Sequence, residues 1–336
     1  MKDVARAADV SLQTVSTVVN DKPGVTDETR QRVLAAVATL GYRPYSIARS
    51  LRTRRTRTIA LVISDIANPS FATMASAAEV HAHANGYSLM LYNTHDDVER
   101  EASYIAVAGE RWVDGVLFVA AEDRLDGLAA LHSAGIPSVA IDRIPQGYTG
   151  PSVTIDNVAA GRLAAEHLLA LGHTRLAHIS GPLHLRISRE RQEGFRRHIA
   201  ASDVAPGLVA CAEGDWTCAA GYAAMQSILM QGPPPSGIFA ANDRMAIGAM
   251  AAMAAAGLCV PHDVSIVGLD DIEVSAYQLP ALTTVQQAFA ELATAALHLL
   301  LDLLADHPPA TTQIVMQPHL IVRQSTRPLT DGAAAS

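Results

Sequence analysis

The chain has 336 residues, of which 49% are hydrophobic, and this length suggests roughly two or three folding units of about 150 residues each. No apolar run reaches the roughly 18 residues that a membrane span needs, and the N-terminus lacks the apolar core of a signal peptide. The sequence therefore predicts a cytoplasmic protein that does not enter a membrane. Residues 1–57 carry eleven Lys and Arg against five Asp and Glu, a charge of +6, whereas the remaining residues carry −14. A basic segment attracts phosphate, and an acidic remainder discourages unselective coating of nucleic acid.

Residue patterns for catalysis or metal binding are sparse. The sequence has no GxSxG elbow, no GxxxxGK[ST] loop and no HExxH motif. The thirteen histidines are scattered, and His81 and His83 are two residues apart on a predicted helix, which is poor metal geometry. We expect the histidines at the surface, and Cys211, Cys218 and Cys259 as reduced, mostly buried thiols. The prediction is a protein that is not an enzyme, with no cofactor, catalytic residue or metal site.

The first predicted elements are two short helices between Val4 and Asn20, separated by a tight turn. The apolar seam of this stretch changes register at Asp9-Val10-Ser11, as two crossing helices require, and it consists of Ala5, Ala8, Val10, Val15 and Val19. Ser11 can cap the second helix, because its hydroxyl oxygen can accept a hydrogen bond from a free backbone N–H near Thr14. The pattern indicates a helix-turn-helix.

The polar face of the second helix suits the major groove of DNA, where Gln can bond adenine and the methyl groups of Thr or Leu can meet thymine methyls. The candidate DNA contacts are Leu12, Gln13, Thr14, Ser16, Thr17 and Asn20. An ordinary helical hairpin with a solvated polar face is the alternative.

A third helix is predicted from Thr26, which can cap it, to Gly41, which can end it in a left-handed conformation. Val33, Val37 and Leu40 are expected to pack against the first two helices. Arg43-Pro44 then breaks the chain, and residues 45–51 could form one or two helical turns that are too short to be stable alone. A basic run continues to residue 57 and favours phosphate contact: Arg49, Arg52, Arg54, Arg55 and Arg57.

From Thr58 the pattern changes to apolar strands that alternate with amphipathic helices, as expected of parallel sheets covered on both faces. The predicted strands are 59–64, 87–93, 115–120 and 136–142, and after Asp156 the alternation repeats with strands 175–180, 208–212, 236–241 and 264–270. Helices are predicted near 69–80, 163–171, 192–200, 219–229 and 245–256. Two doubly wound lobes should therefore share a ligand-binding cleft at the carboxyl ends of their strands.

Polar and aromatic residues that follow the predicted strands should line this cleft. They occur at 65–71, 142–143, 242–243 and 270–271, and they are joined by Arg191 at a predicted helix start and Trp216 after a strand. Carboxylates, an amide, a guanidinium and aromatic faces suit a polyhydroxylated molecule, because polar bonds fix hydroxyls while a ring stacks on CH groups. Each residue also has a structural explanation: Asp270 as a helix cap, Trp216 as core, Arg191 as a surface ion pair.

Ordered motifs along the chain closely resemble the LacI/GalR family of bacterial transcription regulators. The motifs are KDVARAADVSLQTVSTVVN, VTDETRQRVLAAVATLGYRP and IARSLRTRRTRTIALVIS, then IDR at Ile141, HLLALGHTRLAHISGP at His167, EGFRRH at Glu193, EGDW at Glu213, ANDRMAIGAM at Ala241, VSIVGLDDIE at Val264 and PALTTVQQ at Pro280. The resemblance covers nearly the whole chain. It implies an N-terminal all-α helix-turn-helix head and an α/β body of two periplasmic-binding-protein-like lobes with doubly wound parallel sheets.

The resemblance also implies domain bounds and residue roles. The head would span 1–44, a hinge helix and linker 45–57, the effector-binding and dimerisation domain 58–330, and a tail 331–336. The hinge helix would fold on operator DNA, with Leu51 wedged into the central base step and Ala48 near the groove floor. In the cleft, the implied effector contacts are Ser70, Phe71, Asp142, Arg143, Arg191, Trp216, Asn242, Asp270 and Gln287.

Four positions depart from the family pattern. Asp9 occupies a turn position where Gly is usual, and Asp tolerates the left-handed conformation at some cost. Thr17 stands where Arg is frequent, which removes a strong guanine contact. Tyr45 replaces a frequent capping Asn of the hinge helix, and Ser70 replaces an aromatic residue beside Phe71.

The prediction is a homodimeric, ligand-responsive DNA-binding regulator, a repressor of a sugar or carbon-source operon that releases its pseudo-palindromic operator when a sugar-like inducer binds the cleft. The alternative within this class is a corepressor-dependent regulator that binds a nucleobase or nucleotide, with the opposite sign of response. Two other classes stay open, an extracytoplasmic sugar-binding protein and an enzyme that uses the cleft. The chain shows no leucine heptads after its last strand, so a dimer is expected and not a tetramer.

Overall fold

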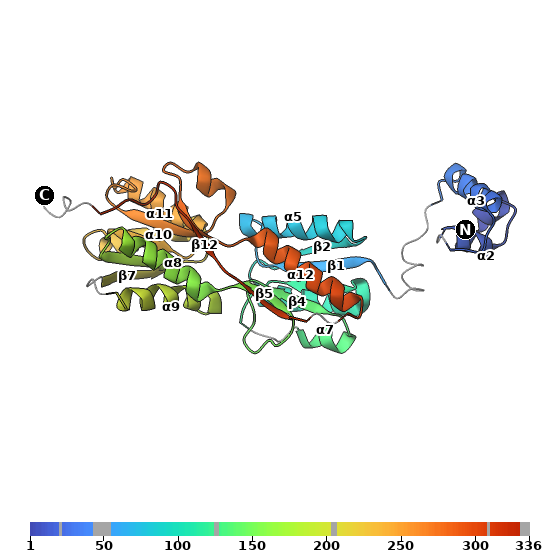
Figure 1. The fold of residues 1–336 in the computed structure, drawn as a ribbon, viewed down its shortest axis with the longest axis horizontal. Helices are drawn as coiled ribbons and strands as arrows, with labels where there is room; N and C mark the ends of the chain where they lie inside the picture. Colours follow the sequence, from blue (N-terminus) through green and yellow to red (C-terminus); the bar gives the residue numbers. More distant parts are fainter. Residues whose placement is uncertain (20–21, 43–54, 124–127, 203–206, 308–309, 330–336) are drawn as a thin grey trace. The chain divides into compact units, whose positions relative to one another are not determined.

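In a computed structural model of the chain, the described residues are 1–19, 22–42, 55–123, 128–202, 207–307 and 310–329 (Figure 1). Contacts within the chain divide it into two compact units, Met1–Thr56 and Arg57–Ser336. Most of the predicted hinge segment lies outside the described residues, including Tyr45, Ala48 and Leu51. Among the described residues, no helix is both long and apolar enough to cross a membrane.

The first unit contains three helices, α1 (Lys2–Ala7), α2 (Leu12–Val19) and α3 (Asp27–Thr39). They pack around a small core of Val4, Ala5, Ala8, Val15, Val18, Val33 and Ala36. Both predicted caps form: the hydroxyl oxygen of Ser11 accepts from the backbone N–H of Thr14 at 3.0 Å, and Thr26 accepts from the N–H of Thr29 at 3.4 Å. Asp9 adopts the left-handed conformation that the turn requires, with φ of 50°.

Two burial predictions in this unit were wrong in detail. Val18 is 3% exposed, whereas Val19 is only partly buried, because residues 15 and 18 share one helix face and residue 19 lies at its edge. Leu40 is 47% exposed, and Ala36 fills the corresponding part of the core. Leu40 is the C-cap of α3, and the chain turns away at Gly41, whose φ is 56°.

The second unit holds two six-stranded sheets. The sheet of the first lobe has the strand order β11-β5-β4-β3-β1-β2 and is parallel throughout, with β1 (Thr58–Ile63), β2 (Ser88–Asn93), β3 (Gly115–Phe118), β4 (Ser138–Ile141), β5 (Ser152–Ile155) and β11 (Gln313–Met316). The sheet of the second lobe has the order β12-β10-β9-β8-β6-β7, with β6 (Arg175–Ser180), β7 (Gly207–Glu213), β8 (Gly237–Ala240), β9 (Ser265–Asp270), β10 (Thr283–Gln286) and β12 (His319–Ile321). Only β12 runs antiparallel to its neighbour, β10.

Helices cover both faces of each sheet, as the buried strands require. In the first lobe, α5 (Pro69–Ala84) and α12 (Phe289–Leu304) lie side by side (Figure 1), and the remaining elements are α6 (Val98–Val107), a π-helical turn (Ala108–Trp112) and α7 (Leu128–Ala134). In the second lobe, α8 (Asn157–Ala170) pairs with α9 (Arg186–Ala200), and α10 (Cys218–Met230) pairs with α11 (Asp243–Ala255). A 3-10 helix spans Glu273–Tyr277.

The chain passes between the lobes three times, which the sequence pattern did not predict. It crosses from β5 to α8, returns from β10 to α12, and crosses again from β11 to β12. The repeat after Asp156 therefore does not close the first lobe, because α12 and β11 complete it from the far end of the chain. One apolar core therefore extends through both lobes. It contains Ile59 and Leu117 of the first lobe and Leu176 and Phe239 of the second.

Two expectations about single residue types were wrong. Cys211, Cys218 and Cys259 are free but exposed, since they lie on an edge strand, at a helix start and in a loop. His178 is fully buried, stacked on Phe239 with ring centroids 4.9 Å apart, and burial lowers its pKa to about 4. A neutral imidazole therefore fills space between aromatic rings in the core of the second lobe.

Candidate functional site

A small pocket lies between the lobes, at the carboxyl ends of β1, β4, β8 and β9. Its cavity volume is about 20 Å³, and it is lined by Asn68, Phe71, Asp142, Arg143, Ile187, Arg191, Trp216, Asn242, Asp270 and Phe289. This position is the one where doubly wound folds bind ligands. We call it the interlobe pocket.

Three residues of the interlobe pocket adopt strained backbone conformations. Asp142 has φ of 62°, Trp216 has φ of 73° and Asp270 has φ of 120°. Asp142 directly follows β4, Asp270 is the last residue of β9, and Trp216 comes just after β7. Side chains rarely adopt these conformations, which cost of order 1–3 kcal/mol each and gather at binding sites. The sharp turns aim three functional side chains into one small volume.

Arg191 is the central cation of the pocket and is only 3% exposed. Its guanidinium donates to the side-chain oxygen of Asn157 at 2.9 Å, to the carbonyl oxygen of Ala241 at 2.7 Å and to the side-chain oxygen of Gln287 at 3.0 Å. It also lies 5.6 Å from the ring centre of Trp216. Helix α9 can bring it there because α8 has glycine at 161, where an added methyl group would overlap the backbone of Arg191.

The partners of Arg191 lie at the connections between the lobes. Asn157 is the first residue of α8, directly after the crossing from β5, and Gln287 lies on the crossing from β10 to α12. Gln287 in turn donates from its amide nitrogen to the Asp142 carboxylate at 2.5 Å. One guanidinium therefore ties together two of the three interlobe connections and, through Gln287, the end of β4.

Burial sets the protonation of this site. It raises the pKa of Asp270 well above the usual value, against the opposing effects of the Arg191 charge and the Ser70 hydroxyl. It also lowers the pKa of Arg191, which Asp270 and Asp142 partly restore. Beneath the pocket, Asp243 is fully buried at the start of α11, and burial raises its pKa to about 7. Its carboxyl group accepts from Ile272 N–H, Ser275 and Thr284, so it anchors the chain that follows Asp270.

Arg143 comes from the first lobe and reaches the second. Its guanidinium carbon lies 5.7 Å from the ring centre of Phe71 and 5.8 Å from that of Trp216. One nitrogen donates to Asp96 at 2.5 Å. A flat, hydrogen-bonding group is thus already placed against two aromatic rings, one from each lobe.

Further charge pairs join the lobes around the pocket. Arg189 on α9 bonds Asp123 of the first lobe at 2.9 Å, and Arg244 on α11 contacts Asp65 of the first lobe at 3.3 Å. These side chains are partly exposed, so each pair contributes little stability by itself. Together with Gln287 and Arg143 they connect the facing edges of the lobes.

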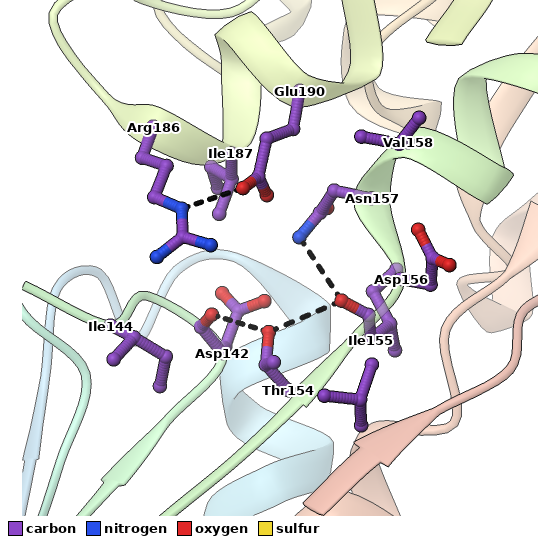
Figure 2. A pocket seen from close by; sticks show the side chains of 11 residues that line it. Asp142, Ile144, Thr154, Ile155, Asp156, Asn157, Val158, Arg186, Ile187 and Glu190 are labelled. Carbon is purple, nitrogen blue, oxygen red and sulfur yellow. Dashed lines mark hydrogen bonds and ion pairs between the residues drawn. The ribbon is translucent and has the colours of Figure 1, made fainter. Parts of the chain in front are cut away.

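A second, larger pocket of about 150 Å³ adjoins the first and shares Asp142 and Ile187 with it. Figure 2 shows Arg186 and Glu190 of α9 on one side, bonded to each other at 2.6 Å, and Asp142 and Thr154 of the first lobe on the other. The hydroxyl of Thr154 donates to the carbonyl oxygen of Asp142 at 2.9 Å, which helps to hold the strained turn. Thr154 therefore holds the backbone of Asp142.

The structure brings together most of the cleft residues that the sequence singled out. Phe71, Asp142, Arg143, Arg191, Trp216, Asn242 and Asp270 line the interlobe pocket. Ser70 and Gln287 are buried behind it, where Ser70 acts on the Asp270 carboxyl and Gln287 joins Arg191 to Asp142. Their roles as effector contacts stay predictions. The placement of Arg191 at a helix start was wrong, since α9 begins five residues earlier at Arg186.

Sequence reasoning missed two residues of the pocket, Ile187 and Phe289, whereas Asn68 lies within the predicted range 65–71. Asn68 had a signal, because an Asn before Pro69 is a helix start, and its side chain does cap α5. Ile187 was missed because α9 begins after Leu185, which has no capping side chain. Phe289 begins α12, whose return to the first lobe no local pattern reveals.

The candidate DNA-contacting face of α2 is open. Leu12 is 46% exposed and Gln13 is exposed, while Thr14, Ser16 and Thr17 are half-buried. The hydroxyl of Thr17 donates to the carbonyl oxygen of Gln13 at 3.0 Å. Asn20, Ala48 and Leu51 lie outside the described residues. Of the basic run, Arg57 belongs to the second unit, where its guanidinium lies 5.2 Å from the ring centre of Tyr87.

The described residues contain no group of three or more His, Cys, Asp or Glu arranged to hold a metal ion. The site is instead an open helix face in one unit and a polar, aromatic pocket in the other. That combination defines a DNA-binding protein with a ligand-binding body.

Comparison with known proteins gives the family. Residues 1–45 match the bacterial regulatory proteins of the lacI family, and residues 165–326 match the periplasmic binding protein-like domain. The HTH-type transcriptional repressor PurR of Haemophilus influenzae (strain PittEE) is 35% identical over 333 residues, which cover 97% of this chain and 98% of the relative. The chain belongs to the LacI family of transcription regulators, as the motifs predicted.

Solved structures agree with this assignment. The lac repressor dimer bound to operator and the anti-inducer ONPF superposes with a TM-score of 0.89 at 30% identity, over 97% of this chain and 98% of that one. The complex of the transcriptional regulator CelR with cellobiose gives a TM-score of 0.73 at 32% identity, over 96% and 98%. Regulators of this family bind operator DNA and small-molecule effectors, so the chain is a ligand-responsive DNA-binding regulator and its family is not one of enzymes.

Proposed function

We propose that the chain is a repressor that binds a pseudo-palindromic operator as a homodimer, with α2 in the major groove of each half-site. The exposed Leu12 and Gln13, the capped start of α2 and the positive charge of residues 1–57 support this docking. Two heads on a two-fold axis would read half-sites about one helical turn apart.

The effector that we propose is a nucleobase that acts as a corepressor. The observation that carries this choice is the Arg143 guanidinium, a flat group set against the rings of Phe71 and Trp216. A nucleobase is also flat, and ring faces with a few buried polar groups are the usual means of binding such a molecule. The match over nearly the whole chain to a transcriptional repressor named PurR favours the same class.

A sugar is the second candidate, and a specific observation favours it. Asp142, Asp270 and Asn242 converge on the pocket beside two aromatic walls, and such a set can bond several hydroxyl groups at once. The CelR structure holds a sugar, cellobiose. With a sugar the expected response is inducing, so the ligand would release the operator.

Arg191 suggests how the pocket acts on DNA binding. An effector bound beside its guanidinium would disturb or reinforce the bonds to Asn157 and Gln287, which lie on two of the three connections between the lobes. An effector shifts the balance of two lobe arrangements only if it binds one of them better. A coupling of the usual 1–3 kcal/mol would change operator affinity by roughly 5- to 150-fold.

A thermal-unfolding screen of the purified full chain separates the two effector classes. The panel contains the common nucleobases, D-ribose, D-glucose and cellobiose, each at 10 mM or at its solubility limit if lower. A ligand present at about 100 times its dissociation constant adds roughly 2.7 kcal/mol to stability. Stabilisation by one or more nucleobases and by no sugar supports the proposal. Stabilisation by a sugar alone would reject the nucleobase in favour of the second candidate.

A further inference from the structure

Arg143 is a buried cation with one charged hydrogen-bond partner, Asp96. The Arg143 side chain is 6% exposed and that of Asp96 is 43% exposed, so the pair runs from the interlobe pocket to the surface of the first lobe. The two residues are 47 positions apart in the sequence. Asp96 belongs to the turn between β2 and α6, where its backbone has φ of 55° and its N–H donates to the carbonyl oxygen of Ser64 at 3.1 Å.

The surroundings of Arg143 make this partner important. A guanidinium that has left water needs an opposite charge or several acceptors close by. Arg191 is a like charge close to Arg143, and both guanidinium groups lie within 6 Å of the Trp216 ring centre. The Glu101 carboxyl interacts electrostatically with Arg143 and accepts from the N–H of Ala121. Asp96 therefore offsets the repulsion that would otherwise push Arg143 away from the ring.

Two buried donors in the interlobe pocket have no hydrogen-bond partner among the described residues. They are the Nε–H of Arg143 and the indole Nε1–H of Trp216. Buried polar groups in folded proteins are nearly always bonded, so such an exception calls for an explanation. Neither nitrogen is open to solvent, so a ligand with acceptor atoms would satisfy them after it displaces the side chains that cover them.

We propose that Asp96 is a positioning residue for the effector pocket: it holds Arg143 against Phe71 and Trp216, where the free Nε–H of Arg143 meets an acceptor of the effector. This role rests on the proposed effector site, and it requires an effector with a hydrogen-bond acceptor atom. Asp96 touches no part of the pocket itself and acts only through Arg143. It follows that a ring compound with acceptor atoms binds better than an apolar ring of the same size.

The first test uses fluorescence and needs neither effector nor DNA. The chain has two tryptophans, Trp112 and Trp216, so Trp112→Phe leaves Trp216 as the single reporter beside Arg143. In this background Asp96→Asn should shift the Trp216 emission and raise its quenching by acrylamide, because the guanidinium loses its anchor. Glu79→Gln removes an equal charge from an exposed site on α5 and should change neither signal. Equal spectra and quenching for Asp96→Asn and Glu79→Gln would overturn the proposal.

The second test measures affinity for the nucleobase or sugar that the thermal screen identifies. Asp96→Asn should weaken binding by about 3- to 10-fold, as loss of a partly exposed charge-assisted bond implies. Arg143→Gln should weaken it at least as much, and the double variant should be no worse than Arg143→Gln alone, because Asp96 acts only through Arg143. Additive losses would refute the positioning role. If no compound in the screen binds, the proposed effector class fails while the fluorescence result still decides the position of Arg143.

Discussion

Arg191 offers the sharpest test of how the pocket is held together. The substitution Arg191→Lys keeps the positive charge but replaces a planar fork by a single point donor. In the parent protein the guanidinium donates hydrogen bonds to three acceptors, on Asn157, Ala241 and Gln287, at 2.7–3.0 Å. An ammonium group at the same depth can reach one of them, so two buried acceptors lose a charged donor.

A hydrogen bond to a charged group contributes about 1.5–3 kcal/mol, so two lost bonds correspond to about 3 kcal/mol or more of unfolding free energy. For a unit of this size, that loss lowers the melting temperature by about 6 °C or more. Urea unfolding of the full chain, followed by circular dichroism, measures the change as a shift in midpoint at constant slope.

The matched control is Arg186→Lys on the same helix. Arg186 is half-exposed and bonds only Glu190, so its replacement should leave stability within about 0.5 kcal/mol of the parent. A stability of Arg191→Lys within the same 0.5 kcal/mol would refute the reasoning, because the three buried bonds would then be irrelevant to folding.

Three further predictions follow from particular residues. Gln13→Ala should cost about 1–3 kcal/mol of operator binding and relax specificity at one base position in each half-site, measured by anisotropy with base-substituted duplexes; a uniform loss on all duplexes would contradict a base contact. Asp270→Asn should abolish effector binding in calorimetry while the affinity of the effector-free protein for DNA is unchanged, and equal loss of both would contradict its place in the pocket. Asp243 has a folded-state pKa of about 7 against an unfolded value near 3.8, so its contribution to stability is complete below about pH 4 and is lost as the pH rises to 7. Asp243→Asn should therefore flatten the decline of stability between pH 4.5 and 7, and an unchanged slope would contradict the assignment.

Local chemistry explains what the sequence could predict. Ser11 and Thr26 cap their helices through hydroxyl groups three residues from their partners, and such short-range bonds are visible in the residue order. The strand ends that carry Asp142 and Asp270 were also predictable, because apolar runs end there in acidic residues. The same reasoning gave most of the residues that line the interlobe pocket.

Long-range pairing explains what it could not predict. The return of α12 and β11 to the first lobe brings Phe289 into the pocket, and strand order in a parallel sheet depends on contacts far apart in sequence. Helix α9 begins after Leu185 without a capping side chain, so its first turn carries no local signal. The pairing of Arg143 with Asp96 likewise arises only when two loops of the first lobe meet.

The central claim is that ligand binding between the lobes controls DNA binding. The most direct measurement first selects duplexes from a randomised library with the full chain, then follows anisotropy of the selected duplex while a nucleobase or sugar from the thermal screen is titrated. The account predicts a pseudo-palindromic sequence whose affinity changes by roughly 5- to 150-fold at saturation, upward for a nucleobase corepressor and downward for a sugar inducer. An affinity that stays constant while calorimetry shows the ligand bound would contradict it.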